Sequence, residues 1–378
     1  MYQPGGRLIL SHGNAGKRYG YGKLRLLSCG LQASTCFMKL INLKGTPVEI
    51  GYQHGELLRE QVRRVWKFYS ETLFNSRLAQ LKEYGYNFLK VVREFHSDYA
   101  TEMAALAEGA GLASWQIAAL NARTEILHNL TDIDVGECTA MYLPYTRILG
   151  QNWDWMEELE PLVVVMHIER ADGHRILQMT EPGIIGKIGL NSNGMGVCLN
   201  MIRGGARTDS VPVHIMLRAI LDADSIDEAL DILGNAQGTC SNILMADDQG
   251  SSVDLELAKQ SSTIVDYAGE SPIHTNHYLS YLRESIDVSK QESFPNSTAR
   301  FARAKALIQQ FECHAGMEEL QSILGDTEDP TYPICRDYLP SSGHRVGTVA
   351  SVMMDLPGRA LHVTRGNPSL NPYTRFLL

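Results

Sequence analysis

The sequence predicts an α+β fold in which a helical segment precedes antiparallel sheets, and three observations predict it. Apolar residues recur at helical spacing over about 48–126, whereas after Gly136 short β-branched and aromatic stretches alternate with turn residues. Later helices and strands do not alternate regularly, as they would around a parallel sheet. The 378 residues are 44% apolar and 20% charged, an ordinary globular composition that excludes wholesale disorder.

The first part of the predicted fold is a helical layer. Apolar residues recur at helical spacing at Ile50, Leu57, Leu58, Val62 and Val65. The pattern continues through the helices expected over 78–96 and 99–108. Gly109 and Gly111 are natural helix stops, and Ser114 is expected to cap the next helix before Trp115.

The second part is predicted to be strands joined by tight turns. Asp172-Gly173 and Asn193-Gly194 are two-residue hairpin signals, which indicate antiparallel pairing. The strands are expected over 138–143, 147–152, 162–169, 175–180, 185–191 and 195–200.

The last part mixes both kinds of element. Ser225 and Glu228 form a capping box that opens a helix ending at Gly234. The other helices are expected over 213–221, 299–311 and 317–324, and the strands over 242–246, 252–257, 262–265, 346–355 and 360–364.

The first residues differ in charge from the rest. Residues 1–48 contain seven basic and no acidic side chains, although the whole chain has a net charge of −9. We expect residues 1–37 to be a leader outside the fold, either a disordered tail or a transit-like segment. The acidic balance predicts no nucleic-acid partner, and no apolar run approaches the roughly 20 residues that span a bilayer, so we expect no membrane partner.

The seven cysteines are scattered and contain no CxxC pair, which argues against a disulfide framework or a structural zinc site. We therefore expect an intracellular, cytoplasmic protein, with organellar import through the basic leader as the alternative. Phe376-Leu377-Leu378 at the end is not a peroxisomal tripeptide.

Several familiar catalytic motifs are missing. The sequence has no GxxxxGK[ST], GxSxG or HExxH pattern and no GxGxxG between a strand and a helix. His274 and His277 lie close together, but no third ligand follows at a recognisable spacing. The sequence therefore predicts no metal and no bound cofactor.

Cys138 is the informative cysteine, because it opens the first strand after the helical layer. With the surrounding blocks, the chain resembles the acyl-coenzyme A:6-aminopenicillanic acid acyltransferase family, the C45-type cysteine enzymes among the N-terminal-nucleophile hydrolases. The resemblance covers about 38–364 and rests on these blocks: Gly45-Thr46-Pro47, Glu49 to Tyr52, His54-Gly55, Asn121 to Glu125, Cys138-Thr139, Gly150 to Asp154, Glu181, Gly183 to Lys187, His274 to His277 and Tyr332 to Arg336.

The resemblance implies a four-layer αββα sandwich and an enzyme that cuts its own chain between Glu137 and Cys138. The expected products are a small helical subunit, 38–137, and a large one, 138–378, which together form one domain. The new α-amine, with an ordinary pKa of about 7.7 to 8.0, can act as base toward its own thiol. Acyl transfer then runs through a thioester on Cys138.

The resemblance also implies three supporting residues. Asp154 matches the aspartate that orients the α-amine, Asn276 the asparagine that donates to the oxyanion, and Arg336 the arginine beside the aspartate. Two positions depart from the penicillin enzyme: Glu137 replaces a glycine before the nucleophile, and Ala258 replaces a serine, so penicillin is not carried over as the substrate.

The predicted function is transfer of an acyl group from acyl-CoA or an amide to the amine of a small peptide-like metabolite. Two alternatives stay open. The first is hydrolysis of N-acyl amines through the same thioester, with water as acceptor. The second is a non-catalytic binding protein of the same fold, in which the bond before Cys138 is never cut.

Overall fold

The computed structural model describes residues 38–131, 138–234, 237–285, 295–311, 314–341 and 343–378. The predicted leader, 1–37, and Glu137 lie outside these residues. In the described part of the chain, no helix is both long and apolar enough to cross a membrane.

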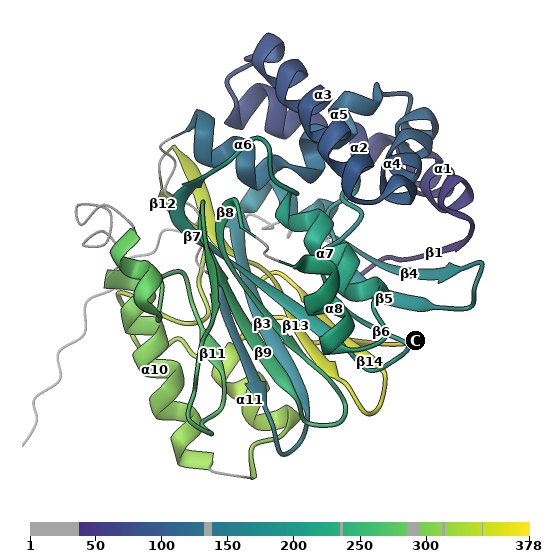
Figure 1. Cartoon of the computed structure of the whole chain (residues 1–378). Coiled ribbons are helices and arrows are strands. Elements are labelled where there is room, and N and C mark those ends of the chain that lie inside the picture. The colour runs from purple at the N-terminus through teal and green to yellow at the C-terminus, as the bar shows by residue number, and fades with distance from the viewer. Residues whose placement is uncertain (1–37, 132–137, 235–236, 286–294, 312–313, 342) are drawn as a thin grey trace, which may run out of the picture. The chain divides into compact units, whose positions relative to one another are not determined.

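The predicted helical layer is confirmed (Figure 1). Its helices are α1 (Pro47–Leu57), α2 (Arg59–Lys67), α3 (Leu78–Phe95), α4 (Ser97–Ala110), α5 (Ser114–Asn121) and α6 (Arg123–Leu130), with a π-helical turn, η1 (Phe68–Leu73), after α2. Gly111 ends α4 in the left-handed conformation, as predicted. The expected cap at Ser114 is wrong by one residue, because Ala113 is the N-cap of α5 and Ser114 is already helical.

Glycines let α1 and α4 pack with their backbones in contact. A β-carbon on Gly55 would lie 2.2 Å from the carbonyl oxygen of Leu106, and one on Gly109 would lie 2.4 Å from that of Tyr52. Both distances are far below a van der Waals contact. The two helices can therefore approach this closely only where neither side chain is present.

The described strands form two sheets, which we call sheet I and sheet II. Sheet I has the order β1-β4-β5-β6-β7-β8-β9-β10. Its pairs are antiparallel except β1 with β4, which are parallel. The strands are β1 (Leu40–Gly45), β4 (Val164–Arg170), β5 (Arg175–Thr180), β6 (Ile188–Asn191), β7 (Gly196–Ala206), β8 (Thr239–Ala246), β9 (Ser252–Leu257) and β10 (Ser262–Ile264).

Sheet II has the order β11-β2-β3-β13-β14-β15, with β12 paired to β13. Its strands are β2 (Thr139–Leu143), β3 (Ile148–Met156), β11 (Ile273–His274), β12 (Leu339–Ser341), β13 (His344–Asp355), β14 (Ala360–Arg365) and β15 (Thr374–Leu377). Short 3-10 helices, η2 (Glu157–Leu162) and η3 (Tyr281–Ser285), follow β3 and precede the last helices.

The two sheets face each other, and helices cover both outer faces (Figure 1). Helices α7 (Val213–Asp222) and α8 (Ile226–Leu233) pack on sheet I, whereas α10 (Pro295–Phe311) and α11 (Met317–Leu324) pack on sheet II. One hydrophobic cluster runs between the sheets and into the helical layer. The predicted α+β fold with αββα layers is therefore confirmed.

The hairpin signals were correct and several short elements were missed. Gly173 and Gly194 have φ of 90° and 85° in the turns between β4 and β5 and between β6 and β7. β1, β11, β12 and β15 were not predicted, and α10 begins at Pro295 rather than at residue 299. Sheet pairing stabilises such short strands, and a local sequence pattern does not report it.

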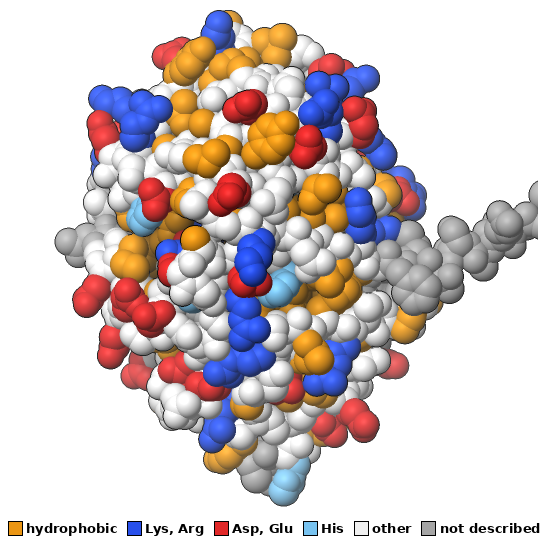
Figure 2. Space-filling view, turned by 90° about the vertical axis from the view of Figure 1, so that its right-hand side faces the viewer, with side chains coloured by type: hydrophobic (Ala, Val, Ile, Leu, Met, Phe, Trp, Pro, Cys, Tyr) orange, Lys and Arg blue, Asp and Glu red, His pale blue; other side chains and the backbone are white. Residues whose placement is uncertain are grey.

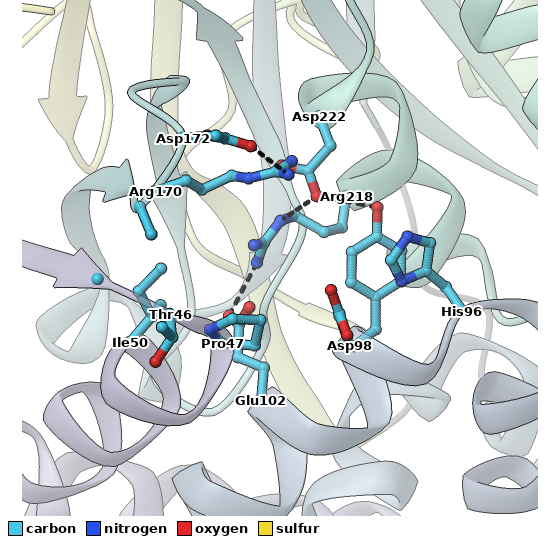
Figure 3. A pocket seen from close by; sticks show the side chains of 13 residues that line it. Thr46, Pro47, Ile50, His96, Asp98, Glu102, Arg170, Asp172, Arg218 and Asp222 are labelled. Atoms are coloured by element: carbon cyan, nitrogen blue, oxygen red, sulfur yellow. Dashed lines mark hydrogen bonds and ion pairs between the residues drawn. The ribbon is translucent and has the colours of Figure 1, made fainter.

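Buried polar contacts join the helical layer to the rest of the chain. Arg218 of α7 donates to Glu102 of α4 at 2.8 Å, and both side chains are buried. Tyr99 of α4 donates to Asp222 of α7 at 2.9 Å. These residues, together with Arg170 of β4, line a pocket of about 220 Å³ (Figure 3).

The surface of mixed charge agrees with the composition. On the face that Figure 2 shows, acidic side chains lie around a short central group of Lys and Arg side chains. Some exposed charges of the described residues are paired, for example Lys44 of β1 with Glu169 of β4 at 2.6 Å.

Candidate active site

Cys138 lies directly before β2, where the strand pair with β3 begins. Thr139 is opposite Asn152 and Ala140 is opposite Gln151 in this antiparallel pair. The Cys138 side chain is 4% exposed, and the backbone N–H of Asp154 donates to its sulfur. Two of the residues predicted for the site are therefore neighbours across the strand pair.

Burial, with a further contribution from the charge of Asp154, raises the pKa of the Cys138 thiol to about 11. The positive charge of Arg300 acts in the opposite direction. In the continuous chain this thiol is therefore protonated near pH 7. Because the thiolate is the nucleophile, the site needs a base that can take this proton.

Asp154 is a buried carboxylate with unequal oxygens. The hydroxyl of Thr348, opposite it on β13, donates to Oδ1 at 2.7 Å. Oδ2 has no hydrogen-bond partner among the described residues. Burial raises the pKa of Asp154 to about 7, although the charge of Arg300 and the Thr348 hydrogen bond lower it. A positive group at Oδ2 would favour the ionised carboxylate.

β3 carries different chemistry on its two faces, because successive side chains of a strand point to opposite sides. Asn152 points toward α11 and donates to the carbonyl of Leu324 at 2.7 Å. Gln151, in contrast, accepts from the N–H of Leu199 in sheet I at 2.9 Å. Trp153 and Trp155 share this second face, while Asp154 shares the first.

Asn276 lies in the loop after β11, and its side chain has a defined orientation. Its Oδ1 accepts from Arg300 at 2.9 Å, and its Nδ2 donates to the carbonyl of Met201 at 2.8 Å. Because a guanidinium only donates, the Arg300 contact identifies which end of the amide is oxygen. An amide nitrogen carries two hydrogens, so a second hydrogen remains beside the one that Met201 receives.

Arg300 of α10, which was not predicted as a site residue, joins Cys138 to Asn276. Its Nη1 donates to the backbone carbonyl of Cys138 at 2.7 Å and to the hydroxyl of Thr139 at 2.8 Å. Its Nη2 donates to Asn276, and its Nε to Asn296 at 2.6 Å. A guanidinium holds its donors in a fixed planar fork, whereas the three donors of a lysine rotate on a single nitrogen.

A signal for Arg300 was present in the sequence. Arg300, Ala304 and Ile308 follow each other at intervals of four, and all three are buried on the inner face of α10. The helix was predicted, but its arginine at an apolar position was not interpreted. A charged residue in the apolar stripe of a helix needs a partner, because burying an unpaired charge is costly.

Arg336 lies on the other side of Thr348 from Asp154. Its backbone N–H donates to the Thr348 hydroxyl at 3.0 Å, and its carbonyl accepts from the Thr348 N–H at 3.0 Å. Burial lowers the pKa of its guanidinium to about 10. The backbone of Arg336 and the carboxylate of Asp154 therefore share the Thr348 hydroxyl, and the charge of Arg300 acts on Asp154 directly.

Lys187 is a second buried cation near the thiol. Its Nζ pairs with Glu181 and lies 3.1 Å from the centroid of the Trp153 ring. Burial lowers its pKa to about 7, although the charges of Glu181 and Cys138 raise it. Glu181 also binds Arg123 of α6 at 2.9 Å, so this charge cluster connects the site to the helical layer.

His274 and His277, considered as metal ligands from the sequence, bind protein groups. His274 contacts Glu256 through Nε2 at 3.0 Å, and Nδ1 of His277 contacts the hydroxyl of Ser297 at 2.8 Å. Among the described residues, no three His, Cys, Asp or Glu side chains are grouped to hold a metal ion. Glu137, the other residue of the predicted cleavage bond, lies outside the described residues.

Comparison with known proteins agrees with the resemblance seen in the sequence. Residues 144–370 match the family model described as acyl-coenzyme A:6-aminopenicillanic acid acyl-transferase, which is more than half of the chain. The chain belongs to this family. The family and the curated relative below are described as acyltransferases, and the chain is an enzyme of this class. The matched residues include Asp154, Asn276, Arg300 and Arg336, and begin after Cys138.

Curated relatives extend this result. The chain is 29% identical over 349 residues to the acyl-coenzyme A:6-aminopenicillanic-acid-acyltransferase 40 kDa form of Emericella nidulans, covering 89% of this chain and 95% of that family member. It is 25% identical over 240 residues to protein dcd1A of Dictyostelium discoideum, covering 54% of each.

Two solved structures were also found at low similarity. A mutant of conjugated bile acid hydrolase from Clostridium perfringens has a TM-score of 0.44 and 12% identity, covering 65% of this chain and 97% of its own. Penicillin V acylase from Agrobacterium tumefaciens has a TM-score of 0.40 and 12% identity, covering 64% of this chain and 86% of its own.

Proposed function

We propose that the protein is an autoprocessing acyltransferase that uses Cys138 as an N-terminal nucleophile. In the first step Sγ of Cys138 adds to the carbonyl carbon of Glu137 and the peptide C–N bond breaks. This shift leaves a thioester and a free α-amine. Water then hydrolyses the thioester, which releases the Glu137 carboxylate and regenerates the thiol.

The unpartnered oxygen of Asp154 is the observation that carries this proposal. Burial disfavours the ionised carboxylate and raises the pKa of Asp154, although the charge of Arg300 lowers it, and no group donates a hydrogen bond to Oδ2 among the described residues. Cleavage before Cys138 would create an amine next to this carboxylate. The pair would orient the amine, and the amine would then accept the proton of the thiol on the same residue.

Turnover then uses the contacts of the mature site. The thiolate attacks the acyl carbon of an amide or an acyl-CoA, the α-amine carries the thiol proton, and the leaving amine or CoA thiolate receives it. The acceptor amine attacks the resulting thioester and restores the thiol. The free hydrogen on Nδ2 of Asn276 would donate to the oxyanion, while Arg300 holds the other end of that amide.

The peptide-like amine acceptor is proposed from the relative in Emericella nidulans, whose name describes acyl transfer from CoA to 6-aminopenicillanic acid. Ala258, where the penicillin enzyme has a serine, lies in a small apolar cluster with Tyr278 and Leu282. Tyr278 is two residues from Asn276. We therefore propose an acceptor that differs from 6-aminopenicillanic acid in the group that would face this cluster.

Intact mass and a denaturing gel test the cleavage. The wild type should give two polypeptides, produced by cleavage between Glu137 and Cys138, and Cys138→Ala should give one. Cys198→Ala, which removes another buried thiol, is the matched control and should still be cut. An uncut wild type would contradict the proposal and favour a binding protein of the same fold.

A second assay separates transfer from hydrolysis. The mature enzyme is given an acyl-CoA with and without a panel of small amines, and CoA release and product mass are measured. We expect CoA release to rise with the amine and the N-acyl product to accumulate. Release that is independent of the amine would instead assign the enzyme as a hydrolase.

A further inference from the structure

The loop that carries Asn276 has little regular structure of its own. It runs from the end of β11 at His274 to the start of η3 at Tyr281. A donor to an oxyanion must nevertheless be held within a fraction of an ångström of its position. The contacts that hold this loop are therefore part of the machinery of the site.

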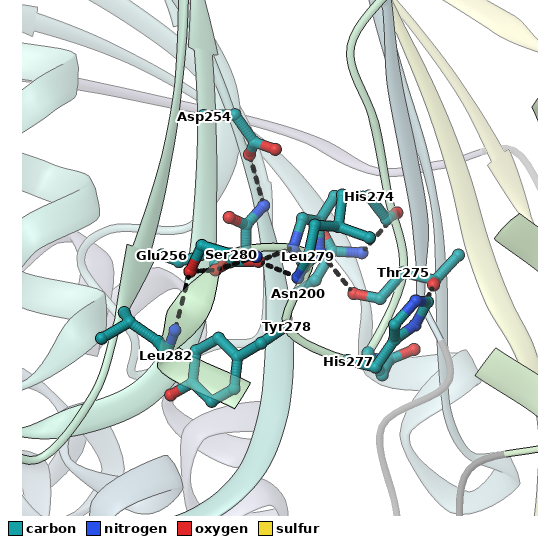
Figure 4. A network of polar contacts seen from close by, with 12 residues as sticks. Asn200, Asp254, Glu256, His274, Thr275, His277, Tyr278, Leu279, Ser280 and Leu282 are labelled. Carbon is teal, nitrogen blue, oxygen red and sulfur yellow. Dashed lines mark hydrogen bonds and ion pairs between the residues drawn. The ribbon is translucent and has the colours of Figure 1, made fainter. Parts of the chain in front are cut away.

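Glu256 of β9 holds both ends of this loop (Figure 4). At the far end, its Oε1 accepts from the backbone N–H of Leu279 at 2.5 Å. Its Oε2 accepts from the N–H of Ser280 at 3.2 Å and from the Ser280 hydroxyl. At the near end, Oε1 contacts Nε2 of His274 at 3.0 Å. Glu256 is fully buried.

The His274 ring is held in its doubly protonated form by this arrangement. Its Nδ1 faces the carbonyl of Thr275 at 2.8 Å and its Nε2 faces the carboxylate of Glu256. Both partners only accept, so both ring nitrogens must donate. Burial disfavours the imidazolium, but the charge of Asp254 and the hydrogen bond to Glu256 raise the pKa of His274 above its usual value.

α10 holds the middle of the loop from the other side. The hydroxyl of Ser297 accepts from the backbone N–H of Asn276 at 2.7 Å, and Arg300 binds the side-chain oxygen of Asn276. Glu256 and α10 therefore fix the two ends and the centre of the same loop. A shift of either would move the Asn276 amide relative to Cys138.

We infer that Glu256 is a positioning residue, which sets the Asn276 amide for the acyl-transfer step by holding His274, Leu279 and Ser280. The inference rests on the proposed function, because it assigns Glu256 a role in that reaction. It predicts an effect on the chemical step rather than on substrate binding. It also predicts that the effect passes through Asn276.

The test is Glu256→Gln, measured on the mature, cut enzyme. Glutamine keeps the size, but it has one acceptor oxygen and removes the counter-charge of His274. We expect kcat to fall about 10-fold to 100-fold, as for a displacement of up to 1 Å at a catalytic group, with KM changed less than about 2-fold. Glu102→Gln, another buried carboxylate in an ion pair, is the control and should keep the wild-type kcat.

A double-mutant cycle shows whether Glu256 acts through Asn276. Asn276→Ala alone should lower kcat by about 10² to 10³. In that background, Glu256→Gln should lower kcat further by less than about 3-fold, because the group it positions is already gone. Full additivity, or an unchanged kcat in folded Glu256→Gln, would overturn the inference.

Two outcomes separate this inference from the proposed function. A wild type that is uncut would overturn both, whereas an active enzyme with a normal kcat in Glu256→Gln would overturn the positioning role alone. Should Glu256→Gln not fold, Ser280→Ala removes one contact to the same carboxylate. It should lower kcat about 2-fold to 5-fold in the wild type and have no further effect on Asn276→Ala.

Discussion

Arg300 shows how much of this site depends on one side chain. Its guanidinium binds the Cys138 carbonyl, the Thr139 hydroxyl and the Asn276 oxygen, three acceptors on two separate segments. Burial lowers its pKa, while the charges of Asp154 and Cys138 raise it. Because the five donors of arginine have a fixed geometry, this residue sets both a distance and an orientation between the backbone at Cys138 and the Asn276 amide.

A pH dependence at Asp154 follows from its burial. Its pKa in the folded chain is about 7 against an ordinary 3.8, so the folded chain holds a proton there that the unfolded chain releases. Stability should therefore fall as pH rises from about 4 to about 7, by at most about 4 kcal/mol. Thermal unfolding of uncut Cys138→Ala over this range measures the fall.

The matched variant for this experiment is Asp154→Asn in the same uncut background, which should lose the contribution of this residue to the pH slope. The difference in Tm between the two variants should grow toward pH 7 in favour of the asparagine. If the plots of Tm against pH were parallel for the two variants from about pH 4 to about pH 7, Asp154 would not titrate in this range.

At the scale of elements, the contact between α1 and α4 depends on the missing side chain of Gly55. A methyl group there would meet the Leu106 carbonyl at 2.2 Å, so the helices would have to separate. Gly55→Ala should therefore destabilise the protein by about 1 to 3 kcal/mol, despite the higher helix propensity of alanine. Chemical denaturation of the uncut Cys138→Ala chain gives the value.

Ala104→Ser is the control for that substitution, since it adds an atom to the exposed face of α4. Its effect should stay within about 0.5 kcal/mol. A stable Gly55→Ala variant would mean that the backbone contact can relax at little cost.

At the scale of the whole molecule, Glu181 ties the helical layer to the candidate site. It accepts from Tyr69 of η1 and Arg123 of α6, and it pairs with Lys187 near Cys138. Burial raises its pKa, but the charges of Arg123 and Lys187 lower it to about 2. The contacts of Glu181 with Tyr69 and Arg123 join the two segments that cleavage before Cys138 would separate.

Glu181→Gln should destabilise the uncut Cys138→Ala chain by about 3 to 5 kcal/mol at pH 7, because two buried cations lose their counter-charge. The stability that Glu181 contributes is present above pH 4.5 and is lost as pH falls toward about 2. The difference in the free energy of unfolding between Cys138→Ala and the same chain with Glu181→Gln, measured by denaturation, should therefore become smaller toward pH 3.

Glu270→Gln, which breaks the exposed pair with Lys305, controls for the loss of a charge and should cost no more than about 1 kcal/mol. If the two substitutions lowered the free energy of unfolding equally, the buried ion pairs of Glu181 would contribute no more than an exposed pair.

The parts of the fold that the sequence predicted are those set by local patterns. Helical spacing found α3 and α4, and Asp172-Gly173 found the hairpin of β4 and β5. β1 was missed because its parallel pairing with β4 joins residues far apart in the chain. The resemblance selected Cys138, Asp154 and Asn276, which the structure brings together. Arg300 was not selected, although its place in the apolar stripe of α10 is visible in the sequence, and Glu256 was not selected because its contacts are tertiary.

β3 has different side chains on its two faces, and this limits the length of the turn between β2 and β3. Side chains alternate between the two faces at every residue of a strand. If one residue inserted between Leu143 and Ile148 shifted the register of β3 by one, each side chain of β3 would point to the opposite face. Asp154 would then point toward sheet I, and an indole would take its place beside Thr348. A register shift of two residues would keep each side chain on its face but would move the Asp154 carboxylate by about 7 Å along the strand. Length changes in this turn are therefore tolerable only where the turn itself absorbs them as a bulge.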